Sequence, residues 1–95
     1  MNINTIRKKA TPIFNQHKIA YAGLFGSFSR QQQTQKSDID IVIKLGKPIG
    51  MLEYMRFIND LESTLNRKVD IMTEGSMNKH IKPYVMQDII TIYEK

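Results

Sequence analysis

The sequence predicts an α/β or α+β domain in which helices flank one small mixed β-sheet. Apolar residues recur at spacings of three and four near the N-terminus and again over residues 51–65, as in amphipathic helices. Short β-prone segments alternate with these helical segments along the chain. The 95 residues are enough for one domain and too few for two, so we assign residues 1–95 to a single domain.

The first helix is expected over residues 2–17, with an apolar face made of Ile3, Ile6, Ala10, Ile13 and Phe14. Pro12 lies inside this pattern and should kink the helix or begin a new first turn. Residues 19–25 are apolar and β-prone and end at Gly26, which predicts a strand followed by a tight turn.

Two further elements follow in the middle of the chain. Ser27 can cap a short helix that runs through Gln33. Residues 38–45 read DIDIVIKL, and their period-two alternation predicts a strand. Residues 51–65 are the second clear helix, with an apolar stripe made of Leu52, Met55, Ile58, Leu61 and Leu65.

In the last third of the chain, the residue pattern predicts a strand at residues 69–72, a loop at 74–76 and a helix over 78–90. Residues 90–93 are either the end of that helix or a last short strand, because periodicity does not decide between them. The apolar side chains at this end belong either to a partner-binding face or to the core: Ile89, Ile90, Ile92 and Tyr93.

The composition excludes several kinds of site. There is no cysteine for a disulfide or a thiolate metal site, and the two histidines, His17 and His80, are far apart in sequence. Any metal would therefore be held by oxygen atoms, which favours magnesium, manganese or calcium. No apolar run approaches the roughly 20 residues that span a bilayer, so we expect a soluble, cytoplasmic protein without a membrane partner.

The formal net charge of +5 favours anionic partners, although a solvated basic surface explains it equally well. The basic residues are spread along the chain and are not interleaved with aromatic residues, so nucleic acid is not expected as a direct ligand. The methionines are expected to fill the core and interfaces rather than to form a cofactor site: Met51, Met55, Met72, Met77 and Met86.

The pair Asp38 and Asp40 carries the main chemical signal. Residues two apart on a strand point to the same face, so the two carboxylates should lie side by side. Two carboxylates this close repel each other, and each raises the pKa of the other, unless solvent screens them or a cation neutralises them. The neighbouring Ile39 and Ile41 indicate a packed strand, so we expect a divalent cation between the carboxylates.

Asp70, in the predicted strand 69–72, can complete a cluster of three carboxylates if that strand is adjacent in the sheet. Three acids around two magnesium ions suit in-line phosphoryl or nucleotidyl transfer. Each acid taken singly is more simply a turn residue or a solvent-facing strand residue. The interpretation therefore depends on the combination, and on the motif that precedes it.

Gly26 and Ser27 follow a strand and open a short predicted helix. A glycine lets the backbone approach a ligand closely, and a helix N-terminus offers free N–H groups to a phosphate. Alone, this pair would be read as a tight turn and a helix cap.

The stretch from Gly26 to Ile41, GSFSRQQQTQKSDIDI, resembles the signature of nucleotidyltransferases of the DNA polymerase beta superfamily: glycine-serine, ten residues, then aspartate-any-aspartate. Leu24-Phe25, Arg30 and Ser37 also match the flanks of that signature. Residues 68–71 resemble the strand of the third acid, and residues 81–84 resemble the closing helix of minimal members. The resemblance covers nearly the whole chain and implies a polymerase-beta-like core.

The resemblance also implies roles for individual residues. Gly26 and Ser27 would hold the terminal phosphates of the nucleotide, with Arg30 and Ser37 as further nucleotide-binding residues. Asp38 and Asp40 would bind both magnesium ions, with manganese as an alternative. Asp70 would bind the catalytic ion and help to deprotonate the acceptor. One departure concerns Gln31, which stands where the family commonly has glycine and puts efficiency or acceptor choice in doubt.

Within the superfamily, the chain resembles minimal nucleotidyltransferases that pair with a HEPN ribonuclease. This implies an antitoxin that uses ATP and magnesium to adenylylate a tyrosine on a HEPN toxin. The alternative is a non-catalytic antitoxin that neutralises its partner by contact. Transfer to an antibiotic or other small molecule is disfavoured, because the acceptor-binding helical domain of larger relatives has no room in 95 residues.

Overall fold

A computed structural model describes residues 2–26, 38–80 and 82–95. Its elements, in order, are α1 (Ile3–Gln16), β1 (Ile19–Phe25), β2 (Ile39–Leu45), α2 (Met51–Leu65), β3 (Val69–Thr73), the 3-10 helix η1 (Glu74–Ser76), α3 (Lys82–Gln87) and β4 (Ile90–Glu94). The strands form one mixed sheet in the order β3-β2-β1-β4, in which only β2 and β3 are parallel. The predicted helix after Ser27 lies outside the described residues.

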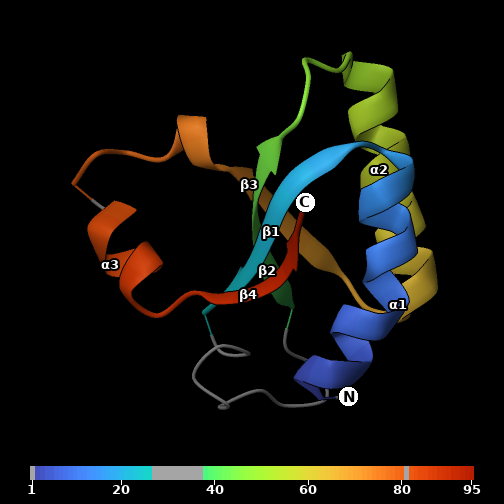
Figure 1. Cartoon of the computed structure of the whole chain (residues 1–95), viewed down its shortest axis with the longest axis horizontal. Coiled ribbons are helices and arrows are strands. Elements are labelled where there is room, and N and C mark those ends of the chain that lie inside the picture. The colour runs from blue at the N-terminus through green and yellow to red at the C-terminus, as the bar shows by residue number, and fades with distance from the viewer. Residues whose placement is uncertain (1, 27–37, 81) are drawn as a thin grey trace.

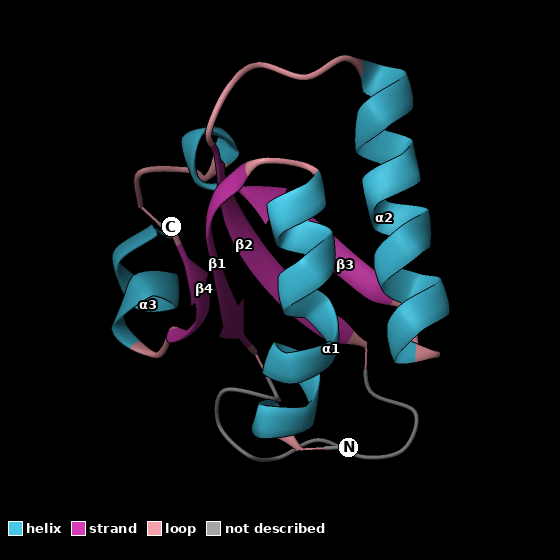
Figure 2. Ribbon diagram, turned by 45° about the vertical axis from the view of Figure 1, so that its right-hand side comes forward, coloured by secondary structure: helices cyan, strands magenta, loops and turns pink. Residues whose placement is uncertain are grey.

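The sheet separates two unequal layers of helix. The long helices α1 and α2 cover one face side by side, whereas α3 lies on the other side of the sheet, near β4 (Figure 1, Figure 2). This confirms the predicted class of a small mixed sheet flanked by helices. Within the described ranges, no helix is long and apolar enough to cross a bilayer.

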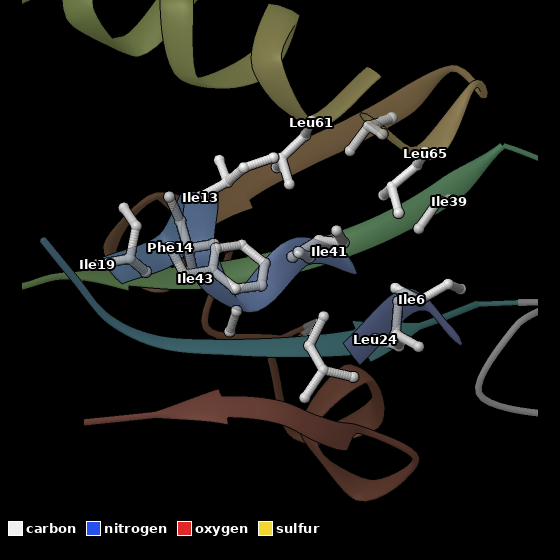
Figure 3. Close-up of a cluster of buried hydrophobic side chains, with 14 of the residues drawn as sticks. Ile6, Ile13, Phe14, Ile19, Leu24, Ile39, Ile41, Ile43, Leu61 and Leu65 are labelled. Carbon is white, nitrogen blue, oxygen red and sulfur yellow. The ribbon is translucent and has the colours of Figure 1, made fainter. Parts of the chain in front are cut away.

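The core lies between the sheet and the two long helices, where aliphatic side chains from the strands, α1 and α2 interdigitate (Figure 3). From β2, Ile39, Ile41 and Ile43 are fully buried on this face. The aromatic rings of Phe14 and Phe57 meet here with their centroids 5.9 Å apart. Because strand side chains alternate between faces, the residues between these isoleucines must point to the opposite face of the sheet.

Helix α1 begins at Asn2, whose side-chain oxygen accepts a hydrogen bond from the Thr5 N–H at 2.8 Å. The helix continues through Pro12, so the expectation of a new first turn there is wrong. Pro12 is exposed, and its missing N–H removes only one bond, the one to the Lys8 carbonyl. The helix layer therefore remains continuous along the sheet.

The predicted apolar stripe of α2 is wrong in its first half. Leu52 and Met55 are 67% and 47% exposed, and the fully buried residues are Phe57, Leu61 and Leu65. The start of α2 stands beyond the end of the sheet in Figure 1, so the first turns of α2 meet the core only through the side that carries Tyr54 and Phe57. The expected core-filling role of methionine is also wrong, because the buried core of the described chain contains none.

The C-terminal third differs from the prediction in detail. Residues 74–76 form a 3-10 helix rather than a loop, and the predicted helix over 78–90 is reduced to α3. The chain then forms the edge strand β4, which pairs with β1. Ile92 is buried, and Ile90 and Tyr93 pack against the core, so these side chains belong to the core rather than to a partner-binding face.

Candidate active site

Two carboxylates lie next to each other on the face of the sheet that α1 and α2 do not cover. Asp40 in β2 pairs with Asp70 in β3 in parallel register. Ile39 and Ile41 on either side of Asp40 are buried under the helices, so the Asp40 side chain points away from them. Asp40 is partly buried and Asp70 is exposed. The cluster of acids depended on the condition that the two acidic strands be neighbours in the sheet, and β2 and β3 meet that condition.

Asp38 lies just before β2, which begins at Ile39 rather than at the predicted residue 38. It is exposed, two residues from Asp40. Burial raises the pKa of Asp40 above its usual range, and the charges of Asp70 and then Asp38 raise it further. The charges of Asp70 and Asp38 therefore combine at Asp40.

Gly26 closes the site on the β1 side. The preceding residue, Phe25, pairs with Asp40 across the antiparallel β1–β2 ladder. Gly26 has a φ of 73°, in the left-handed region, and a Cβ at this position would overlap the Asp40 carboxylate oxygen Oδ2. Only glycine therefore allows the backbone to turn here and to approach the acid so closely.

The chemistry of these groups fits a divalent cation. Carboxylate oxygens are the ligands that magnesium and manganese prefer, and a cation would relieve the repulsion around Asp40. Within residues 2–26, 38–80 and 82–95, no three acidic, histidine or cysteine side chains are already gathered around one point. The Asp40–Asp70 pair with Asp38 beside it is the arrangement that would hold the ion, and the three-ligand cluster stays a prediction.

The remaining predicted residues are placed as follows. Ser27, Arg30, Ser37 and the Gln31 departure lie outside the described residues. His17 belongs to the helix layer: it is 9% exposed, its Nε2 lies 3.0 Å from Asp60 Oδ2, and its ring meets Phe57 edge-on. It is therefore a structural residue.

Two groups that contact or follow β3, the strand of Asp70, were not anticipated from the sequence. Tyr54 of α2 donates a hydrogen bond to the Ile71 carbonyl at 3.5 Å, and burial, followed by the charge of Asp70, raises its pKa. Glu74 of η1 accepts from Lys82 at 2.7 Å and pairs with Lys44 at 3.2 Å, so it links β2 to the first residue of α3. The sequence could not show that Glu74 pairs with Lys44 and Lys82, because single charged residues that are far apart in sequence do not indicate which of them meet.

Helix α3 brings a third unanticipated feature to the site. A hollow of about 130 Å³ lies beside Gly26, and its lining is Phe25, Gly26, Tyr84, Val85 and Asp88. The only sequence signal for it was the match of residues 81–84 to the closing helix of minimal nucleotidyltransferases.

A family model described as Polymerase beta, Nucleotidyltransferase matches residues 8–95. The chain belongs to this family. Among relatives of this nucleotidyltransferase is MJ0435 of Methanocaldococcus jannaschii, named as a candidate protein adenylyltransferase. It is 34% identical over 92 residues, which cover 97% of this chain and 99% of the relative.

Solved structures with the same fold include a candidate minimal nucleotidyltransferase, with a TM-score of 0.82, 24% identity and 95% of each chain covered. Another is a complex of tri-AMPylated Shewanella oneidensis HEPN toxin with an MNT antitoxin. The match there has a TM-score of 0.73 and 19% identity, and it covers 98% of this chain and 73% of the other. The nucleotidyltransferase family match thus extends over residues 8–95, and Asp40 and Asp70 lie on the face of the sheet that α1 and α2 do not cover.

Proposed function

We propose that this nucleotidyltransferase transfers AMP from ATP to a tyrosine hydroxyl of a HEPN-family toxin and so acts as its antitoxin. The observation that carries the proposal is the placement of Asp40 opposite Asp70, with Gly26 against Asp40. The names of the relatives support the acceptor class: MJ0435 is named for protein adenylylation, and a structure of the same fold contains an AMPylated HEPN toxin. Because the donor is ATP, we place the reaction in the cytoplasm.

Each acid has a distinct part in this proposal. Asp38 and Asp40 would hold two magnesium ions, and Asp70 would hold the catalytic one. When bound, the ions neutralise phosphate charge and polarise the α-phosphorus. Asp70, the most accessible acid of the facing pair, would accept the phenolic proton of the acceptor, while Gly26 and Ser27 would bind the terminal phosphates through backbone N–H groups and the Ser27 hydroxyl.

The reaction balances without any further reagent. The acceptor oxygen forms a bond to the α-phosphorus of ATP as the bond from that phosphorus to the bridging oxygen breaks. Pyrophosphate leaves, and the acceptor proton passes to carboxylate or solvent. The chain's contribution is to hold donor and acceptor in line and to stabilise the charge that builds up on phosphate oxygens.

The test is transfer of label from ATP labelled at the α-phosphorus to a purified HEPN-family toxin as the candidate partner, in the presence of magnesium. We expect wild type to label the partner and Asp40→Asn or Asp70→Asn to lose at least about 100-fold in rate. Glu53→Gln is the matched control, because Glu53 is an exposed acid in the first turn of α2, on the far side of the sheet.

The same variants separate catalysis from neutralisation by contact. If Asp40→Asn and Asp70→Asn still suppress the toxicity of the partner in cells while labelling is lost, the contact-only antitoxin is the correct function. If none of the proteins labels the partner but a small molecule acquires label, the acceptor class is wrong.

A further inference from the structure

The hollow beside Gly26 lies between the end of β1 and α3. Phe25 and Gly26 form one wall, and Tyr84 and Val85 of α3 form the other, with Asp88 at the end of that helix. The walls are mainly apolar and include two aromatic rings. Such a lining favours a flat, uncharged group.

The size of the hollow restricts what it can hold. Sites that enclose a whole drug-sized ligand have volumes of about 300–1,000 Å³, whereas this hollow has about 130 Å³. It therefore has room for one ring system of a larger ligand, whose remainder must extend outside.

Gly26 shows in which direction the remainder extends. The same residue lines the hollow and abuts the Asp40 carboxylate, so a single residue separates the apolar hollow from the acids. A ligand that fills both places has a flat ring system at one end and a metal-binding anionic group at the other. A nucleoside triphosphate has this form.

Tyr84 is the notable residue in the lining, because 74% of this large apolar side chain is exposed. Its helix is nevertheless held in place. Lys82, at the start of α3, is bound to Glu74, which also pairs with Lys44 of β2. At the other end Ile89 lies over β1, where a Cβ on Gly23 would be only 2.6 Å from its Cγ1. The helix that carries Tyr84 is thus held at both ends, while the Tyr84 side chain stays exposed.

We propose that Tyr84 is the base-stacking residue of the nucleotide donor and that the hollow holds the purine ring. This inference rests on the proposed function, since it names the subsite for the base of the same donor. Stacking on an aromatic ring tolerates any base. Tyr84 therefore supplies affinity for a base but does not distinguish adenine from guanine.

The test compares equilibrium binding of magnesium ATP with that of magnesium tripolyphosphate, which has the phosphates but no base. We expect Tyr84→Ala to weaken ATP binding by about 10- to 100-fold and to leave tripolyphosphate binding unchanged. Tyr84→Phe keeps the ring and should bind ATP within about twofold of wild type. Gln87→Ala, an exposed change on the same helix, is the matched control and should alter neither ligand.

Three results would overturn the inference: Tyr84→Ala binding ATP as wild type does, Tyr84→Ala losing both ligands equally, or wild type showing no preference for ATP over tripolyphosphate. The labelling assay keeps this failure separate from failure of the proposed function. If the partner is labelled but ATP binding does not depend on Tyr84, only the base subsite is wrong. If ATP binding depends on Tyr84 but the partner is not labelled, only the proposed acceptor is wrong.

Discussion

Asp40 and Asp70 occupy paired positions on neighbouring parallel strands, so their carboxylates share one face of the sheet. This arrangement opposes folding when no cation is present, because burial and the charge of Asp70 both disfavour the ionised form of Asp40. The same repulsion is what a bound cation would relieve. Stability and activity should therefore respond in opposite directions to substitutions at these positions.

We expect Asp40→Asn to stabilise the protein at neutral pH without divalent ions, by less than about 1 kcal/mol because solvent screens the partly exposed group. The pKa of Asp40 is higher in the folded than in the unfolded protein. Ionised Asp40 therefore destabilises the fold fully when the pH is above its folded pKa, and it has no effect when the pH is below its unfolded pKa. The gain should therefore vanish near pH 3. Urea unfolding in EDTA at both pH values measures it, and a loss of stability at neutral pH would contradict it.

Magnesium should stabilise the folded wild type by about 2.7 kcal/mol when the ion is at 100 times its Kd, because binding is linked to folding, and its thermal midpoint should rise accordingly. Asp40→Asn and Asp70→Asn should lose most of this shift. Glu53→Gln should keep it, because Glu53 lies on α2 and away from the acids. Differential scanning fluorimetry across a magnesium titration checks this, and an equal shift in all four proteins would place the ion elsewhere.

Gly26→Ala should destabilise the protein by about 1–2 kcal/mol and abolish transfer. The left-handed φ is unfavourable for alanine, and the new methyl group would displace the Asp40 carboxylate. Gly75→Ala is the matched control, because a Cβ there meets no atom within 4 Å. Unfolding and labelling assays on both variants test the difference, and equal behaviour would show that Gly26 has no positional role.

Leu52→Ala and Leu61→Ala make the same chemical change at two points of α2. Leu61 is fully buried, so its truncation should cost about 2–5 kcal/mol, whereas Leu52 is 67% exposed and should cost less than about 0.5 kcal/mol. Denaturant midpoints of the two variants measure the contrast. A large cost at Leu52 would mean that the first turns of α2 are covered in solution.

Asp60→Ala should cost about 1–2 kcal/mol and leave transfer unchanged. It removes the partner of His17, whose buried ring would keep an unpaired nitrogen between α1 and α2. Asn59→Ala, an exposed neighbour, is the control and should be neutral. If Asp60→Ala reduces labelling at unchanged stability, the pair has a role in the site as well.

The sequence predicted the features that follow from short-range pattern. The bounds of β1 and α2 agree with the structure, and β2 and β3 differ from it by a single residue. The sequence identified Asp40 and Asp70 as candidate partners but left open whether their strands are adjacent, which the parallel pairing of β2 and β3 decides.

Features that depend on distant contacts were not predictable. Leu52 fits an apolar stripe by spacing, but its exposure depends on where the sheet ends. The segment around Ile90 became a strand because β1 has a free edge there, which periodicity cannot show. The Glu74 pairs and the hollow at Tyr84 likewise join residues that are far apart in sequence.

Because β2 and β3 pair in a parallel ladder, Asp40 and Asp70 either face each other fully or do not face each other at all. Strand register changes only in whole residues, and a slip of one residue by β3 would turn Asp70 toward the helices and place Ile71 opposite Asp40. The two carboxylates therefore cannot drift apart gradually as groups on flexible loops can. On heating, we expect the capacity to bind metal to disappear at the same midpoint as the β-sheet, with no intermediate in which a weakened site persists.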